Sequence, residues 1–112
     1  MNLEEEINKD ALKMAWAELQ QRIRKIKLGG GKARLKKLNE QGKLSARERV
    51  NQLVDNPDEV FEVGILAGEK MYEEHGGCPA AGVVVVIAHV SKKRCVIVAN
   101  DPTVKAGAWF PM

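Results

Sequence analysis

The chain has 112 residues, the length of one domain or of part of one. Its 18 Lys and Arg residues exceed its 15 Asp and Glu residues, and the formal net charge is +3 at pH 7. No apolar stretch approaches the roughly 20 residues that span a bilayer, and no secretory leader precedes Leu3. Because Cys78 and Cys95 are the only cysteines, we expect reduced thiols and a cytoplasmic protein without a membrane partner.

The first predicted element is a helix from Asn2 to about Lys27. Its apolar residues recur at spacings of four, three, four and three, which places them in one narrow stripe: Leu12, Trp16, Leu19, Ile23 and Ile26. Acidic residues near its start and basic residues near its end complement the helix dipole. The run Gly29-Gly30-Gly31 should end this helix, because glycine suits the left-handed positions that follow a helix.

Two short helices are expected next. The first runs from about Lys32 to Gln41, and Gly42 is placed to end it. The second begins with a capping box at residues 45–48, in which the Ser45 hydroxyl accepts from the Glu48 amide and the Glu48 side chain reaches back. Asn56-Pro57 should close this helix, whose inward-facing residues are predicted to be Val50, Leu53 and Val54.

Three strands follow in the prediction. Residues 59–66 alternate loosely and indicate an edge strand, whereas 83–88 and 95–99 are uninterrupted apolar runs joined by the polar residues 91–94. Since neither run alternates with polar residues, both faces of these two strands should be covered. The second strand leads into a loop at residues 100–107, rich in Asn, Asp, Pro and Gly. We take this loop as the candidate functional surface, because rigid strands often hold ligand-binding loops.

A basic run is the first candidate for ligand binding. Eight cationic residues and no acidic one lie between Leu19 and Asn39, a composition that attracts nucleic acids or phosphorylated cofactors. A solvated helix face explains the same composition, and the run lacks aromatic residues suited to base stacking. The triple glycine followed by Lys32 and Arg34 suits a phosphate at a helix start, or a simple joint between helices, but it does not complete a Walker A motif.

The remaining chemistry-bearing residues indicate no reaction. Four residues nominally able to bind zinc match no pattern of paired ligands, so we expect no metal in this segment: His75, Cys78, His89 and Cys95. We assign these four residues no role beyond packing or exposure. No nucleophile has a recognisable setting, and the carboxylates form no evident catalytic pair. The chain then stops at Ala108-Trp109-Phe110-Pro111-Met112, with no polar tail after the aromatic pair, which favours the opening part of a larger domain over a short self-associating protein.

Two blocks of sequence resemble the carboxyltransferase (beta) subunits of biotin-dependent acyl-CoA carboxylases. The first block comprises Gly29-Gly30-Gly31, Arg34 and the run from Gly42 to Val50, followed by Leu53-Val54-Asp55. The second block is Ala99-Asn100-Asp101-Pro102-Thr103-Val104-Lys105-Ala106-Gly107-Ala108. The similarity runs in consistent order over residues 20–112 and is greatest to the methylcrotonyl-CoA and propionyl-CoA carboxylase type.

The resemblance implies an α/β (α+β) fold. Residues 1–57 would form a helical N-terminal arm, and residues 58–112 would begin a crotonase-like (ClpP/crotonase) β-β-α spiral, which this chain leaves incomplete. Residues 83–90 and 94–99 would be early strands of that first domain. Members of the family are several times longer and form oligomers, often hexamers, with active sites between domains of different subunits.

The implied reaction transfers a carboxyl group from carboxybiotin, borne on a carrier subunit or domain, to an acyl-CoA. The partners implied are therefore acyl-CoA, the biotin carboxylase and biotin carrier, and further copies of the subunit, with no nucleic acid. Oxyanion-binding turns of the family lie downstream of this chain, so the resemblance implies no catalytic residue here. It implies tentative acyl-CoA contacts in one loop, at Thr103, Val104, Lys105, Ala106 and Gly107.

The sequence departs from the family pattern at several glycines. Ala80, Ala81, Val86, Ala88 and Ala106 stand where the family commonly has glycine, and Lys92 replaces a usual glycine in the hairpin turn. These departures suggest a divergent member and leave the acyl group open. Two other hypotheses stand beside the enzyme: a noncatalytic assembly or regulatory piece of the same family, and a basic nucleic-acid-binding module.

Overall fold

Three helices and a three-stranded antiparallel sheet make up the fold. The computed structural model describes residues 2–111, in which the helices are α1 (Leu3–Lys27), α2 (Lys32–Glu40) and α3 (Ala46–Leu53). The strands β1 (Phe61–Glu62), β2 (Val83–Val90) and β3 (Lys93–Asn100) lie in the order β1-β2-β3. Three single turns of 3₁₀ helix lie outside the sheet: η1 (Glu73–His75), η2 (Pro79–Gly82) and η3 (Lys105–Gly107). The predicted helices and strands are thus confirmed in kind and order.

The core lies between α3 and one face of the β2–β3 hairpin. It consists of small and β-branched side chains: Ala46, Val50, Val54, Val84, Val86 and Ala88. Ile97 and Ala99 are partly buried and pack against this cluster. The Ser45 hydroxyl accepts from the Glu48 amide at 3.2 Å, as the capping box predicts. Leu53 was expected to face inward and is instead 51% exposed, because α3 ends there and the extended Val54 turns into the core.

Only one face of the sheet is covered within residues 2–111. Val96 and Val98 are 68% and 56% exposed, and they pair with the half-buried Ile87 and Val85 on the opposite face from α3. The prediction that both faces are covered is therefore wrong for the described residues, since α3 is the only helix with many contacts to β2 and β3. The middle of the exposed face is apolar, which is typical of an interface, and His89, Arg94 and Asn100 lie at its two ends.

The β2–β3 hairpin closes through a two-residue turn in which Ser91 and Lys92 both have positive φ, at 51° and 67°. Both turn amides donate to the carboxylate of Asp55 at 2.8 Å, and the Asp55 amide donates to His89 O at 2.9 Å. The segment that follows α3 is thereby tied to the hairpin that α3 covers. These hydrogen bonds hold Lys92 in a conformation that glycine adopts more readily.

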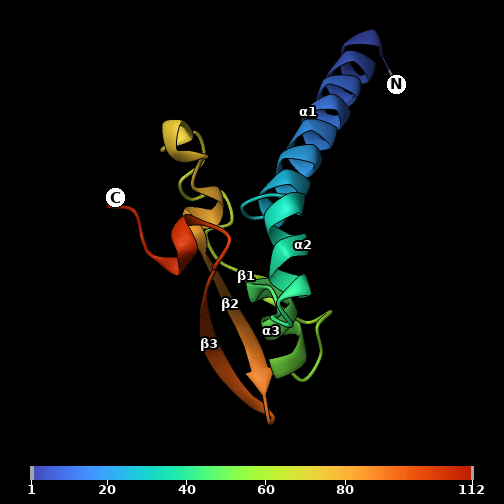
Figure 1. Cartoon of the computed structure of the whole chain (residues 1–112). Helices are drawn as coiled ribbons and strands as arrows, with labels where there is room; N and C mark the ends of the chain where they lie inside the picture. Colours follow the sequence, from blue (N-terminus) through green and yellow to red (C-terminus); the bar gives the residue numbers. More distant parts are fainter. Residues whose placement is uncertain (1, 112) are drawn as a thin grey trace.

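The helix α1 projects away from the rest of the molecule (Figure 1). Only Ile26 of its apolar stripe is buried, whereas Leu12 and Trp16 are 71% and 61% exposed. No helix among residues 2–111 is long and apolar enough to cross a membrane. The last turns of α1 are held by a two-point ion pair between Arg22 and Glu69, with N–O distances of 2.7 and 2.5 Å.

This ion pair lowers the pKa of Glu69 from its ordinary value of 4.5, chiefly through the hydrogen bonds from Arg22. A lowered folded-state pKa stabilises the fold above the ordinary value, and the contribution disappears as the pH falls through the folded pKa. We therefore expect Arg22→Gln to lower the melting temperature slightly at pH 7 and hardly at all at pH 3. Thermal unfolding at both pH values, with Arg24→Gln as the exposed control, checks this. An equal effect of Arg22→Gln at both pH values would contradict it.

Several alanines also occupy left-handed backbone conformations. The φ angles of Ala80, Ala81 and Ala106 are 51°, 56° and 51°. Together with Lys92, these are positions at which the family resemblance leads us to expect glycine. The backbone thus keeps a shape suited to glycine while the side chains have changed. A Cβ in this region costs about 1 kcal/mol per residue, which the surrounding packing must offset.

Replacing Ala106 by glycine should remove this strain. We expect Ala106→Gly to raise the free energy of unfolding by about 0.5–1 kcal/mol, measured by chemical denaturation. Ala108, nearby and also exposed, has φ −82° and ψ 156°, which any residue adopts, and serves as the matched control. Ala108→Gly should be neutral or slightly destabilising. Destabilisation by Ala106→Gly would show that the left-handed conformation is absent in solution.

Candidate functional site

The junction between α1 and α2, made of Gly29, Gly30 and Gly31, is the base of the candidate site. Leu28 still has helical angles, and Gly29 and Gly31 then have positive φ, at 57° and 106°. The Gly29 amide donates to Ile26 O at 2.9 Å and the Gly31 amide to Leu28 O at 3.0 Å. The chain therefore leaves α1 by a tight turn and enters α2 at once. We call this segment the glycine junction.

The glycine junction contacts the loop after β3. The Gly30 amide donates to the Thr103 hydroxyl at 2.9 Å, and that hydroxyl donates to Asp101 Oδ1 at 2.5 Å. The same carboxylate oxygen accepts from the Thr103 amide at 2.9 Å. From the first turn of α2, Arg34 Nη1 donates to the Thr103 carbonyl at 3.1 Å. Segments about 70 residues apart in sequence are thus joined at Thr103.

This contact leaves no room for a side chain at Gly29 or Gly30, whereas a Cβ at Gly31 would meet nothing within 4 Å. A Cβ at Gly30 would lie 1.9 Å from the Thr103 carbonyl oxygen, and a Cβ at Gly29 would lie 2.4 Å from Asp101 Oδ2. Neither distance is possible without movement of the loop or of the junction. Gly29 and Gly30 are therefore explained by close packing against Asp101 and Thr103, and Gly31 by its φ of 106°, without a phosphate at the start of α2. The sequence suggested either a phosphate site at a helix start or a simple joint between helices, and the structure favours the joint.

The structure divides the five predicted loop residues into two groups. Thr103 and Val104 are 6% and 2% exposed, so their side chains serve the packing of the loop. Lys105 and Ala106 are exposed and Gly107 is half-buried, and all three have positive φ in η3. Of the five residues, only Lys105 offers a charged side chain to a ligand.

Lys105 lies among aromatic rings. Its Nζ is 4.5 Å from the centroid of the Phe110 ring and 3.4 Å from the Trp109 carbonyl oxygen, to which it donates. Tyr72 stacks on Phe110 with a centroid distance of 4.2 Å and an angle of 20° between the rings, and the Tyr72 hydroxyl donates to the Pro111 carbonyl. The His75 ring lies 6.1 Å from Phe110. The segment after η3 is thus held against η1.

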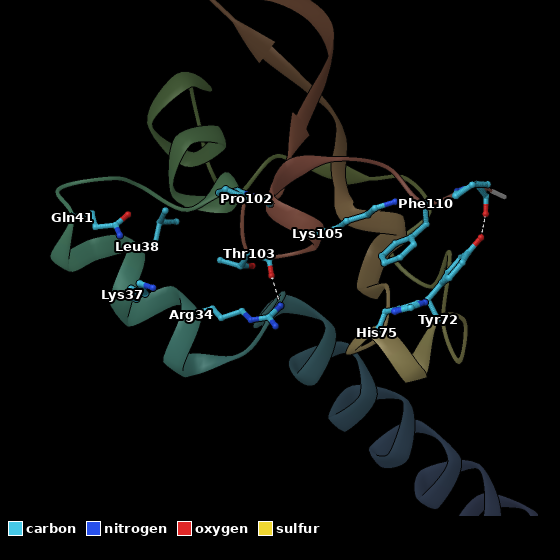
Figure 2. A pocket seen from close by; sticks show the side chains of 12 residues that line it. Arg34, Lys37, Leu38, Gln41, Tyr72, His75, Pro102, Thr103, Lys105 and Phe110 are labelled. Atoms are coloured by element: carbon cyan, nitrogen blue, oxygen red, sulfur yellow. Dashed lines mark hydrogen bonds between the residues drawn. The ribbon is translucent and has the colours of Figure 1, made fainter.

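These groups line an open cleft of about 900 Å³ between α2, η1 and the loop after β3 (Figure 2). Three cationic side chains and three rings are among its lining residues: Arg34, Lys37, Lys105, Tyr72, His75 and Phe110. No carboxylate lines it among the described residues. Positive charge beside stackable rings suits an anionic ligand that also carries a flat aromatic group.

Sequence reasoning had not placed Tyr72 and His75 in the site. Neither lies in a recognisable motif, and both come from the loop-rich passage between β1 and β2. Tyr72 has φ 55°, a conformation that no local pattern predicts. Arg34 serves the fold through its bond to the Thr103 carbonyl. Arg47 also serves the fold, because it pairs through two bonds of 2.7 and 2.9 Å with Glu62 in β1.

The cysteines and histidines form no metal site in the described part of the chain, where no group of three or more suitable side chains comes together. Burial raises the pKa of the Cys78 thiol, and the positive charge of Lys105 acts in the opposite direction without cancelling the rise. Cys78 is 2% exposed and Cys95 is half-buried, and neither forms a disulfide. Cys78 is therefore held as a neutral thiol.

Comparison with known proteins identifies relatives along almost the whole chain. The methylcrotonoyl-CoA carboxylase beta chain of Arabidopsis thaliana is 35% identical over 105 residues, covering 94% of this chain and 18% of that protein. The biotin-dependent 3-methylcrotonyl-coenzyme A carboxylase beta1 subunit of Mycobacterium tuberculosis is 42% identical over 96 residues, covering 86% of this chain and 18% of that subunit. No family model matches the chain.

Solved structures that resemble this chain are likewise of a transcarboxylase and of a carboxylase beta subunit. Transcarboxylase 12S, with methylmalonyl-coenzyme A and methylmalonic acid bound, superposes with a TM-score of 0.74 at 30% identity, over 82% of this chain and 18% of that one. The beta subunit of P. aeruginosa geranyl-CoA carboxylase gives a TM-score of 0.72 at 28% identity, over 91% of this chain and 18% of its own. This chain thus spans about a fifth of the length of these proteins. It belongs to the family of biotin-dependent acyl-CoA carboxylase beta subunits, of which it represents a part.

Proposed function

We propose that this chain is part of an acyl-CoA carboxyltransferase subunit and that it helps to bind the acyl-CoA. The observation that carries the proposal is the cleft in which the predicted loop meets basic and aromatic side chains. The relatives are named as acyl-CoA carboxylases, and one of the similar structures has methylmalonyl-coenzyme A bound. The proposed acyl group is of the methylcrotonyl or propionyl type.

The chemistry of the cleft fits the nucleotide end of coenzyme A. That end carries phosphates, which attract Lys37 and Lys105, and an adenine ring, which stacks on aromatic side chains. The volume of about 900 Å³ lies within the range of about 300–1,000 Å³ for small-molecule sites. Ala106 also lines the cleft, whereas Gly107 lies beside it in the same turn. Of the residues that the sequence suggested, Lys105 would contact a phosphate, while Thr103 and Val104 would support the loop from beneath.

In the complete subunit, we propose that the acyl-CoA receives a carboxyl group from biotin. Carboxybiotin, held on a separate carrier subunit or domain, supplies that carboxyl group when it is bound. The residues of this chain bind and orient the coenzyme A and move no proton, so we assign none of them a catalytic role. The biotin carboxylase and its carrier, and further copies of the subunit in a hexamer, are the proposed partners. A cytoplasmic location stays a prediction.

We also propose that the fold is the start of a crotonase-like β-β-α spiral. The β2–β3 hairpin, with one face covered by α3 and the other apolar and exposed, supports this proposal, since a spiral domain would cover the second face. A division near residue 57, between a helical arm and the domain proper, remains part of the proposal.

Binding of coenzyme A to the 112-residue chain tests the proposed ligand. We expect isothermal titration calorimetry at low salt to detect binding by the wild-type chain. Lys105→Ala and Lys37→Ala should each weaken it about threefold to tenfold, because each removes one cation from the phosphate site. Both side chains are exposed, so neither variant should disturb the fold.

Lys36→Ala is the matched control. Lys36 is an exposed lysine next to Lys37 in α2, but it does not line the cleft. Its removal lowers the net charge equally and should leave the affinity unchanged. An equal loss in all three variants would indicate unspecific attraction of the anion, and an undisturbed affinity in Lys105→Ala and Lys37→Ala would place the ligand elsewhere.

A further inference from the structure

Lys105 has a left-handed backbone conformation, which residues with a side chain disfavour. Lys105 and Ala106 have φ angles of 47° and 51°, which residues with a Cβ adopt only where the surrounding structure holds them. Both are exposed, and the Lys105 side chain contacts Phe110 and Trp109, which follow it in the chain. The constraint must therefore come from the residues on either side of them.

On the preceding side, the chain is fixed at Thr103 and Val104. The Thr103 hydroxyl uses both of its hydrogen-bonding roles, since it accepts from the Gly30 amide and donates to Asp101. Its carbonyl is fixed separately by Arg34. The Thr103 amide is bound by Asp101, and the Val104 side chain is 2% exposed. Every polar group of Thr103 is thus engaged, the hydroxyl by the glycine junction and the carbonyl by the first turn of α2.

On the far side, Lys105 contacts its own turn and the residues that follow it. The Lys105 ammonium donates to the Trp109 carbonyl at 3.4 Å, and the Ala108 amide donates to Lys105 O within the same turn. The Trp109 indole N–H also donates to Asn100 Oδ1 at 3.0 Å, so both ends of the loop are held. The Thr103 end is the one that is joined to the helical segment. Figure 2 shows Arg34 and Lys105 at the two sides of Thr103, both facing the cleft.

We propose that Thr103 is a positioning residue, which sets the conformation of Lys105 for ligand binding by anchoring the loop to the glycine junction. This inference rests on the proposed function, because the ligand that Lys105 meets is the coenzyme A proposed above. The helix junction, and not the sheet alone, would then determine the shape of the binding loop. Arg34 assists by fixing the Thr103 carbonyl while its own side chain lines the same cleft.

Two substitutions distinguish the effect of the Thr103 hydroxyl from the effect of its side-chain volume. Thr103→Val keeps the volume and loses both hydroxyl bonds, whereas Thr103→Ser keeps the hydroxyl. Backbone ¹⁵N relaxation of the free chain reports the order of residues 105–107 without any ligand. We expect the heteronuclear NOE of these amides to fall in Thr103→Val and to be largely retained in Thr103→Ser. Unchanged NOE values in Thr103→Val would overturn the proposal, whether or not the chain binds coenzyme A.

Affinity for coenzyme A then tests whether Thr103 acts through Lys105. At a temperature where circular dichroism shows each variant folded, Thr103→Val should weaken binding about tenfold, corresponding to the loss of a buried hydrogen-bonded anchor. In the Lys105→Ala background, the same change should have less than about a threefold effect, since the group that it positions is gone. Equal effects in both backgrounds, or a lowered melting temperature with unchanged affinity, would show that Thr103 serves stability alone.

Discussion

The contact between the Gly30 amide and the Thr103 hydroxyl is the constraint on which the arrangement of the site depends. It joins the helical segment to the loop after β3 across a distance of 73 residues in sequence. The contact exists only because Gly30 lacks a side chain, since a Cβ there would lie 1.9 Å from the Thr103 carbonyl oxygen. The absence of a side chain at Gly30 thus allows the loop after β3 to lie against the glycine junction. This loop carries Lys105, one of the cations that line the cleft.

A second tie fixes the sheet under that loop. Asp55 accepts from both amides of the hairpin turn, and α3 buries its apolar side chains against β2 and β3. The hairpin therefore holds the start of the loop at the end of β3, while the glycine junction holds its middle. Both ties use hydrogen bonds to backbone amides, which fix positions more closely than apolar packing alone. The opposite face of the sheet stays apolar and exposed, as expected of a part of a larger protein.

Local patterns in the sequence predicted the elements, but only some of their surroundings. Helix stripes, the capping box and the apolar runs gave the helices and strands in the correct order, since these patterns act over a few residues. The prediction that Leu53 faces inward was wrong because α3 ends at Leu53, and the extended Val54 turns into the core instead. Tyr72 and His75 were missed because the irregular loop that carries them has no periodic pattern. The role of Gly30 depends on Thr103, which no local pattern connects to it.

The most direct test of this view is an NMR titration of the ¹⁵N-labelled chain with coenzyme A. If the cleft binds the nucleotide, the largest amide shifts should lie at Lys37, Tyr72, Lys105 and Phe110, with smaller shifts at Gly30 and Thr103. Shifts at Lys105 accompanied by shifts at Gly30 would connect the ligand site with the glycine junction. Shifts confined to α1 or to the exposed face of β3, or no shifts at millimolar coenzyme A, would contradict the proposed site.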